Sequence, residues 1–333
     1  MYNNSQQADQ PRLPSITPIK QRPAASYGTA KSAPTTPPAP TTPPAPTTPP
    51  AAATSPFKEV PDKLKFKIGT IPTRLSTHSY IVEAETFKAL AIVANDKVPL
   101  SHDVFFTPLL AQMEKTLVTA AKINAKATWH ISDDLCTAIL EVDLPSVGHS
   151  VTYDAKTHEC HASISILHSL KQDTLPQICF GLKDTTAKTH FFIGEDLTIR
   201  RRSAKEFGNV NIDAFQKDLT ILGPMFNAAI EQLSAWASTS LRPNRVRAKC
   251  DAFFSDQIWS AACLHEAYLT NAVKMGHNAF TFAQTLASYA TLATGDFALK
   301  PHEKDCGEAL TLFCRRVAVG KALATLTATK RLT

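Results

Sequence analysis

The sequence predicts an α+β fold: a mixed domain with an antiparallel β-meander and a long helix, then a helical bundle, preceded by a disordered Pro/Thr/Ala-rich tail. Three observations predict it. The first 56 residues are proline-rich, short β-branched segments separated by turn residues follow, and the apolar period then changes to 3.6 residues. The predicted divisions are a tail at 1–56, an α+β domain at 57–205 and a helical domain at 206–333.

The tail contains three tandem copies of PTTPPA from 34 to 51. Such a segment lacks large apolar side chains to bury, so we expect disorder with a polyproline II bias. Its four basic residues against Asp9 give it a net charge of +3, half of the +6 of the whole chain. It is therefore either a passive spacer or a basic arm that samples a polyanion.

The region 57–205 combines strand and helix patterns. Alternation of Lys63, Lys65 and Lys67 with Leu64, Phe66 and Ile68 predicts a strand with one cationic face. A second strand is predicted at 79–84, and a helix of about four to five turns follows His102, with its apolar residues at helical spacing. The remaining strands of the meander are predicted at 128–132, 136–143, 149–153, 161–167, 177–182 and 190–193.

From residue 211 onward, apolar residues follow a helical period. The first stripe runs from Ile212 to Trp236, and Gly223 with Pro224 is expected to kink or split it. Further stripes follow at 254–272, 279–292 and 309–326. Short connections between four or five helices predict a bundle.

The seven cysteines form an odd set without CxxC spacing, and no secretory signal opens the chain. We expect reduced, mostly buried thiols in a cytosolic (cytoplasmic) protein. The longest charge-free run outside the tail, Met275 to Gly295, contains His277, Asn278 and Gln284, so no membrane span is predicted.

No enzyme signature is present: there is no GxSxG, HExxH, glycine-rich phosphate loop or GxGxxG. His158, Cys160 and His161 suggest metal ligands, but a strand sends His161 to the opposite face from the other two. His302 and Cys306 could share a helix face, yet no matching pair of ligands accompanies them. We therefore predict no catalytic residue, no metal site and no cofactor.

Clusters of positive charge are the remaining candidates for function. The stretch Ser240–Asp251, SLRPNRVRAKCD, lies between two helical patterns, and similar clusters occur at 200–202 and 315–316. The residues predicted to contact nucleic acid are Arg200, Arg201, Arg202, Arg242, Arg245, Arg247, Lys249, Arg315 and Arg316. Phe253, Phe254 and Trp259 follow the central cluster, either as stacking partners for bases or as core residues. Alternatively, the clusters are solvated or paired with nearby carboxylates. A single basic surface would require all three clusters to lie side by side in the fold.

The order of regions resembles structural and accessory proteins of filamentous plant RNA viruses, such as coat proteins and allexivirus-type accessory proteins. These share a Pro/Thr/Ala-rich N-terminus, a mildly basic body and a helical C-terminal region. The FDFFDG-like block of potexvirus coat proteins has only a short counterpart here, Asp251-Ala-Phe-Phe-Ser-Asp256, and the strand-rich middle departs from the coat fold. The resemblance implies a viral protein involved in virion assembly, and assigns no individual residue a role.

The leading hypothesis is a non-enzymatic RNA-binding or scaffolding protein that contacts RNA phosphates and self-associates or docks to another protein. One rival is a protein–protein interaction adaptor with an incidental basic surface. A second rival is a thiol or metal hydrolase without a recognisable motif.

Overall fold

The structure is a computed structural model that describes residues 55–57, 59–95, 99–153, 156–171, 176–193, 212–254, 258–305 and 307–328. The predicted tail lies outside the described residues except for its last two positions. So do the boundary predicted at 205–206 and the cluster Arg200, Arg201 and Arg202.

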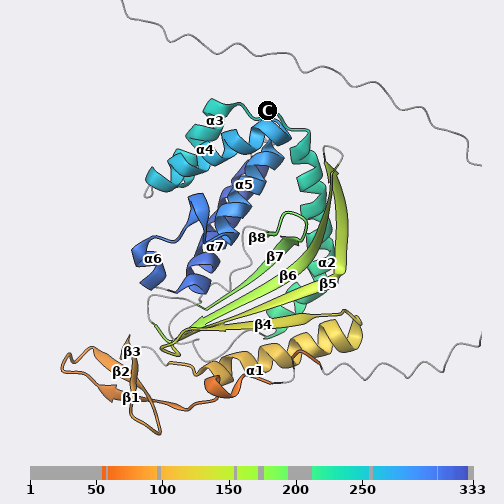
Figure 1. The fold of residues 1–333 in the computed structure, drawn as a ribbon. Coiled ribbons are helices and arrows are strands. Elements are labelled where there is room, and N and C mark those ends of the chain that lie inside the picture. The colour runs from red at the N-terminus through yellow and green to blue at the C-terminus, as the bar shows by residue number, and fades with distance from the viewer. Residues whose placement is uncertain are drawn as a thin grey trace, which may run out of the picture. The chain divides into compact units, whose positions relative to one another are not determined.

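The larger sheet is an antiparallel meander in which each strand pairs with the next along the chain (Figure 1). Its strands are β4 (Lys126–Ile131), β5 (Thr137–Tyr153), β6 (Lys156–Ser169), β7 (Gln177–Asp184) and β8 (Thr189–Phe192). The predicted α+β class and its meander are therefore confirmed.

One predicted strand break is absent. The segments predicted at 136–143 and 149–153 form the single strand β5, with an irregular register between Leu144 and Gly148. A Cβ added at Gly148 would lie 3.1 Å from the Pro145 carbonyl oxygen and 3.3 Å from that of Cys160. The irregularity thus brings the backbone close enough to disfavour a residue larger than glycine, and the strand continues beyond it.

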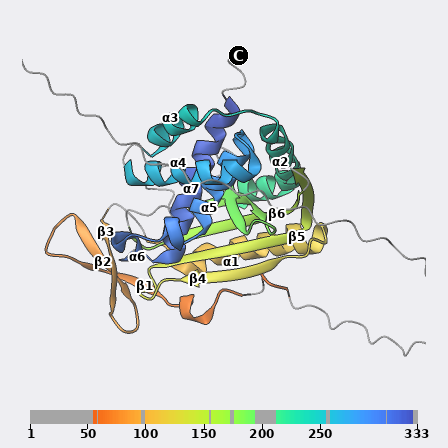
Figure 2. The ribbon, with the colours of Figure 1, turned by 45° about the horizontal axis from the view of Figure 1, so that its top comes forward.

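Helices cover both faces of this sheet (Figure 2). On one face, Ala138, Leu140 and Val142 of β5 belong to the main core with α1 (His102–Met113). The α1 helix begins at the Ser101 N-cap and leads into a π-helical segment, Glu114–Ala120, so the long helix predicted here is confirmed. On the other face, Ile139 of β5 packs with Phe313 of α7 (Glu308–Ala328).

The remaining helices are α2 (Ile212–Ala237), α3 (Pro243–Phe253), α4 (Ile258–Met275), α5 (Ala279–Thr291) and α6 (Pro301–Asp305). Of the kink or split predicted at Gly223 and Pro224, the split is wrong, because α2 continues through both residues. Its buried stripe, including Leu222 and Phe226 on either side of the proline, provides packing that offsets the missing backbone hydrogen bond.

The sheet and the helices share one core. Buried residues of α2, α4 and α5, such as Phe226, Tyr268 and Phe280, belong to the same cluster as Leu140 and Ile164 of the sheet. The helices after residue 212 are therefore packed on the sheet. The predicted change from strands to helices along the chain does not divide the protein into two hydrophobic cores.

A second sheet consists of β1 (Ile68–Pro72), β2 (His78–Glu83) and β3 (Ala89–Ala94), paired antiparallel in chain order. The strand predicted from the 63–68 alternation is wrong over most of its length. Pro61 precedes a 3-10 turn at Asp62–Leu64 that buries Leu64, and Lys65 forms ion pairs with Glu59 and Asp62. The alternation therefore reflects a turn, and β1 begins only at Ile68.

Candidate nucleic-acid interface

The basic stretch predicted as a joint between two helices is itself the helix α3. Pro243 is its first residue, a position where proline's fixed φ suits a helix and its missing N–H removes no bond. Val246 and Cys250 are fully buried and attach the helix to the core. Arg245, Arg247 and Lys249 are therefore held on a defined helical surface, and Arg242 precedes it as the N-cap residue.

Two of these cations lie on one side of α3, and a third immediately precedes the helix. Arg245 and Lys249 are spaced by four residues, which places them on the same side of α3, beside the buried positions, and Arg242 is the N-cap residue three positions before Arg245. Arg242 and Arg245 are exposed and have no ion-pair partner within the described part of the chain. We call Arg242, Arg245 and Lys249 the α3 cationic stripe.

The stripe concentrates positive charge. Partial burial, and then the charge of Arg245, lower the pKa of Lys249 below its ordinary value. The Lys249 ammonium also lies 5.8 Å from the centre of the Phe253 ring. No acidic residue occupies the first turn of α3, and Arg242 and Arg245 sit at the positive end of the helix dipole. An anion bound here would relieve this repulsion.

The fourth cation differs from the other three. The Arg247 Nε donates to both carboxylate oxygens of Asp251, at 3.1 and 3.0 Å, across one helical turn. Its charge is therefore partly neutralised within α3.

The aromatic residues near α3 divide between the two predicted roles. Phe254 is buried and packs edge-on against Tyr289, so it belongs to the core. Phe253 is half-buried beside Lys249. The side chain of Trp259 lies outside the described residues.

The prediction that Arg315 and Arg316 contact nucleic acid is corrected by their burial. Only 6% and 5% of their surfaces are exposed. The Arg315 guanidinium donates to both carboxylate oxygens of Glu303 and to the Phe297 carbonyl oxygen at 2.9 Å. It also lies 4.5 Å from the centre of the Tyr289 ring. These contacts use its donors inside the fold, where a phosphate cannot reach them.

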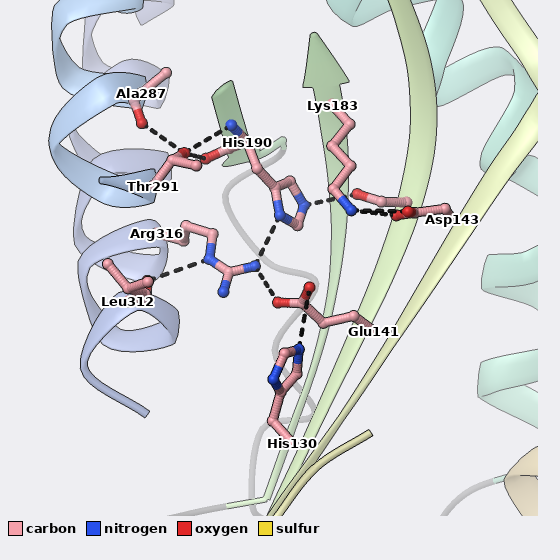
Figure 3. Close-up of polar contacts among 10 residues, drawn as sticks. His130, Glu141, Asp143, Lys183, His190, Ala287, Thr291, Leu312 and Arg316 are labelled. Carbon is pink, nitrogen blue, oxygen red and sulfur yellow. Dashed lines mark hydrogen bonds and ion pairs between the residues drawn. The ribbon is translucent and has the colours of Figure 1, made fainter. Parts of the chain in front are cut away.

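Arg316 belongs to a second buried network, between α7 and the sheet (Figure 3). Its Nη1 donates to the Glu141 Oε1 at 2.5 Å and to the His190 Nδ1 at 2.7 Å. Burial alone would raise the pKa of Glu141, but the interaction with His130, whose Nε2 lies 3.6 Å from the Glu141 Oε2, and the charge of Arg316 outweigh it, so this pKa lies well below its usual value. Lys183 and Asp143 form an ion pair beside the network, with 2.7 Å between Nζ and Oδ1. The network fastens α7 to β5 and β8.

The hydrogen bond between Ser163 and His190 in this network runs in the wrong direction for a serine nucleophile that is activated by a histidine base. Arginine can only donate, so the Nδ1 of His190 must accept from Arg316. The neutral ring then carries its proton on Nε2 and donates it to the Ser163 Oγ, at 2.8 Å. Burial, and then the charge of Arg316, lower the pKa of His190 well below its usual value. His190 therefore has no lone pair with which to activate Ser163.

The other chemical alternatives find little support among the described residues. The His158 Nδ1 lies 2.7 Å from the Asp184 Oδ2, and the described residues contain no group of three or more His, Cys, Asp or Glu side chains placed to hold a metal ion. Burial raises the pKa of the Cys136 thiol to about 11, and those of Cys160, Cys179 and Cys250 to about 12. These four thiols are therefore protonated at neutral pH.

No family model, no curated protein and no solved structure matches the chain. Among the described helices, none combines the length and the apolar content needed to cross a bilayer.

Proposed function

We propose that the chain is a non-enzymatic RNA-binding protein that contacts RNA phosphates through the α3 cationic stripe. The observation that carries the proposal is the set of three neighbouring cations, Arg242, Arg245 and Lys249, at the N-cap and on the surface of a helix anchored in the core, without ion pairs inside the described chain. A phosphate backbone supplies the compensating charges at a regular spacing. Cytoplasmic virion assembly, as the resemblance in layout implies, remains a prediction.

The expected affinity depends strongly on salt. Each phosphate neutralised on a single strand contributes about −0.7 to the slope of log K against log salt concentration, so three contacts give a slope of roughly −2. Fluorescence anisotropy of a labelled single-stranded RNA between low and moderate salt measures this slope. A salt-insensitive affinity contradicts phosphate binding.

Charge variants locate the contact. Arg245→Ala is expected to reduce the slope by about 0.7, and Arg245→Glu to weaken binding further by placing a carboxylate against the RNA. Arg247→Ala has a smaller effect, because Asp251 already pairs with Arg247. Lys126→Ala, which removes an exposed cation on β4, is the matched control and leaves the slope unchanged. Equal losses for Arg245→Ala and Lys126→Ala contradict a specific role for α3.

The rival hypothesis, a protein–protein interaction adaptor, predicts a different result in a pull-down from cell extract. An adaptor retains its partner after nuclease treatment, whereas a partner held through RNA is lost. Retention by the Arg245→Glu variant as well would favour the adaptor.

A further inference from the structure

A short segment connects the Pro/Thr/Ala-rich tail to the folded part of the chain. We call residues 55–57 and 59–64 the strap (orange in Figure 1). Phe57, Val60 and Leu64 are buried, with exposed fractions of 2%, 3% and 0%, in the same core cluster as Leu117. These three apolar side chains therefore hold the strap against the rest of the fold.

The strap runs along α1 from the end of the helix to its start. Ser55 contacts Glu114, which directly follows α1. Phe66, two residues after the strap, packs edge-on against His102, the first residue of α1, with 6.1 Å between the ring centres. Ser55 is thus the point at which the tail meets the folded chain.

The Ser55 hydroxyl fastens this end of the strap. Its Oγ donates to the Glu114 Oε2 and accepts from the Phe57 N–H at 3.2 Å. A carboxylate can only accept, so the contact with Glu114 depends on the hydroxyl proton of Ser55. Glu114 is half-buried, and no Lys, Arg or His of the described chain forms an ion pair with it.

The sequence at this point has the form of a kinase substrate. Ser55 is followed by Pro56, and a protein kinase whose groove offers no acceptor for the next backbone N–H selects proline there, because other residues would bury an unpaired donor. The same order of a hydroxyl residue and a proline recurs in the tail, at Thr17, Thr36, Thr42 and Thr48.

We propose that Ser55 is a phosphorylation site for a proline-directed serine/threonine kinase, and that its phosphate releases the strap from α1. The kinase transfers the γ-phosphoryl group of ATP to the Ser55 Oγ, so an Oγ–P bond forms. The bond from the γ-phosphorus to its bridging oxygen breaks, and ADP leaves with the electron pair. The hydroxyl proton passes to the base of the kinase.

The phosphate turns the attraction between Ser55 and Glu114 into repulsion. Phosphoserine carries a charge of about −1.5 to −2 at pH 7 and has no hydroxyl proton to donate. The Glu114 carboxylate then faces a second anion in place of its hydrogen-bond donor. Release of the strap follows, and it exposes Phe57 and Val60 to solvent.

The burial of Phe57 sets the order of events. A kinase groove binds several residues around its target in extended form, whereas Phe57, two residues after Ser55, lies in the core. The undocked strap is therefore the substrate, and the phosphate retains the strap in that state. Val60→Ala, which weakens docking, is accordingly expected to raise the rate of phosphorylation severalfold.

Phosphorylation in vitro tests the site. The full chain, with the four tail threonines changed to alanine, is incubated with a cyclin-dependent kinase and Mg-ATP. Mass spectrometry is expected to find phosphate at Ser55 and none there in Ser55→Ala. Thr107 is the matched control: it is exposed and precedes Pro108, but it lies inside α1 and is expected to stay unmodified. An unmodified Ser55 in both the parent and Val60→Ala overturns the proposal.

Amide hydrogen exchange tests the release. Phosphorylation is expected to speed exchange in a peptide covering 55–64 at least about tenfold, while the amides of β6 keep their protection. Glu114→Gln removes the repulsion and supplies a donor to the phosphate, so phosphorylation of that variant should change exchange little. Phosphorylated Ser55 with unchanged exchange at 55–64 overturns the switch, as does an equal loss of protection in β6.

Charge variants test the same contact without a kinase. Ser55→Glu is expected to speed exchange at 55–64 relative to Ser55→Gln, and adding Glu114→Lys to Ser55→Glu should restore protection, because the two side chains then attract each other. Failure of this rescue contradicts the electrostatic mechanism. Arg245→Glu should change neither phosphorylation nor exchange, so this proposal does not depend on RNA binding by the α3 cationic stripe.

Discussion

Two helices of this protein contain clusters of arginine, and the structure uses them in opposite ways. On α3, Arg242 and Arg245 are exposed beside a buried stripe. On α7, Arg315 and Arg316 point into the fold and bind carboxylates from α6 and β5. The comparison shows that a cluster of cations in a helical sequence indicates a binding surface only when the cations occupy positions that do not face the core.

The sharpest test of this difference is the removal of a buried arginine. Arg316→Met should lower the free energy of unfolding by about 3–5 kcal/mol, because it leaves Glu141 inside the fold without its main partner. Urea denaturation measures the change. Adding Glu141→Gln should restore part of the loss, since the stranded charge is gone. A loss below about 1 kcal/mol would contradict the burial of this pair.

Acid should lower the free energy of unfolding, because His102 of α1 and His168 of β6 are buried and resist protonation in the folded state. His102 Nε2–H donates to the Leu135 carbonyl oxygen at 3.0 Å, so its Nδ1 accepts from the Nδ1 of His168 at 2.8 Å, and this arrangement requires the His102 ring to be neutral. Burial lowers the pKa of His102 to about 4, and burial, then the charge of His102, lower that of His168 well below 6.5.

A lowered histidine pKa means that the unfolded chain binds more protons, so stability is full above the unfolded pKa of about 6.5 and falls as the pH drops. For His102 alone the loss approaches roughly 3 kcal/mol at pH 4. Unfolding curves between pH 7 and pH 4 measure it. His102→Gln should flatten this dependence, whereas His149→Gln, a change at an exposed histidine, should leave it unaltered.

The smallest expected effect on stability is on α3. Arg245→Glu should raise the free energy of unfolding by about 0.3–1 kcal/mol, because it replaces a cation at the positive end of the helix dipole and relieves repulsion with Lys249. Thermal and urea unfolding would detect this increase. The same substitution is expected to abolish much of the RNA affinity, so stability and binding should move in opposite directions. A clear destabilisation would show that Arg245 supports the fold as Arg316 does.

Much of the fold follows from local patterns. The meander could be predicted because turn residues such as Asp173 separate β-branched segments, although Pro145 and Gly148 lie inside β5 and end no strand. The helices could be predicted because Phe215, Leu219 and Phe226 recur at a helical period. Local patterns failed where the surroundings decide the outcome. The alternation before Ile68 belongs to a turn, and Pro224 lies inside a helix whose packing outweighs the proline.

The candidate site was only partly predictable. The stripe on α3 follows from spacing, but the burial of Arg316 depends on Glu141, far away in the chain. A local signal was nevertheless present. Phe313, Arg316, Gly320 and Leu323 are spaced by three and four residues, on one side of α7. A Cβ added at Gly320 would lie 3.2 Å from the Phe192 carbonyl oxygen, so the glycine marks a close approach to β8 that places Arg316 inside.

The separation between Glu141 and Arg316, 175 positions along the chain, has a consequence for the order of folding. The meander can pair as soon as its hairpins exist, but its polar face must wait until α7 has been synthesised. Until then Glu141 remains hydrated on an open sheet. We therefore expect docking of α7 to be the slow and late step of folding, and the step that commits the sheet to its final form.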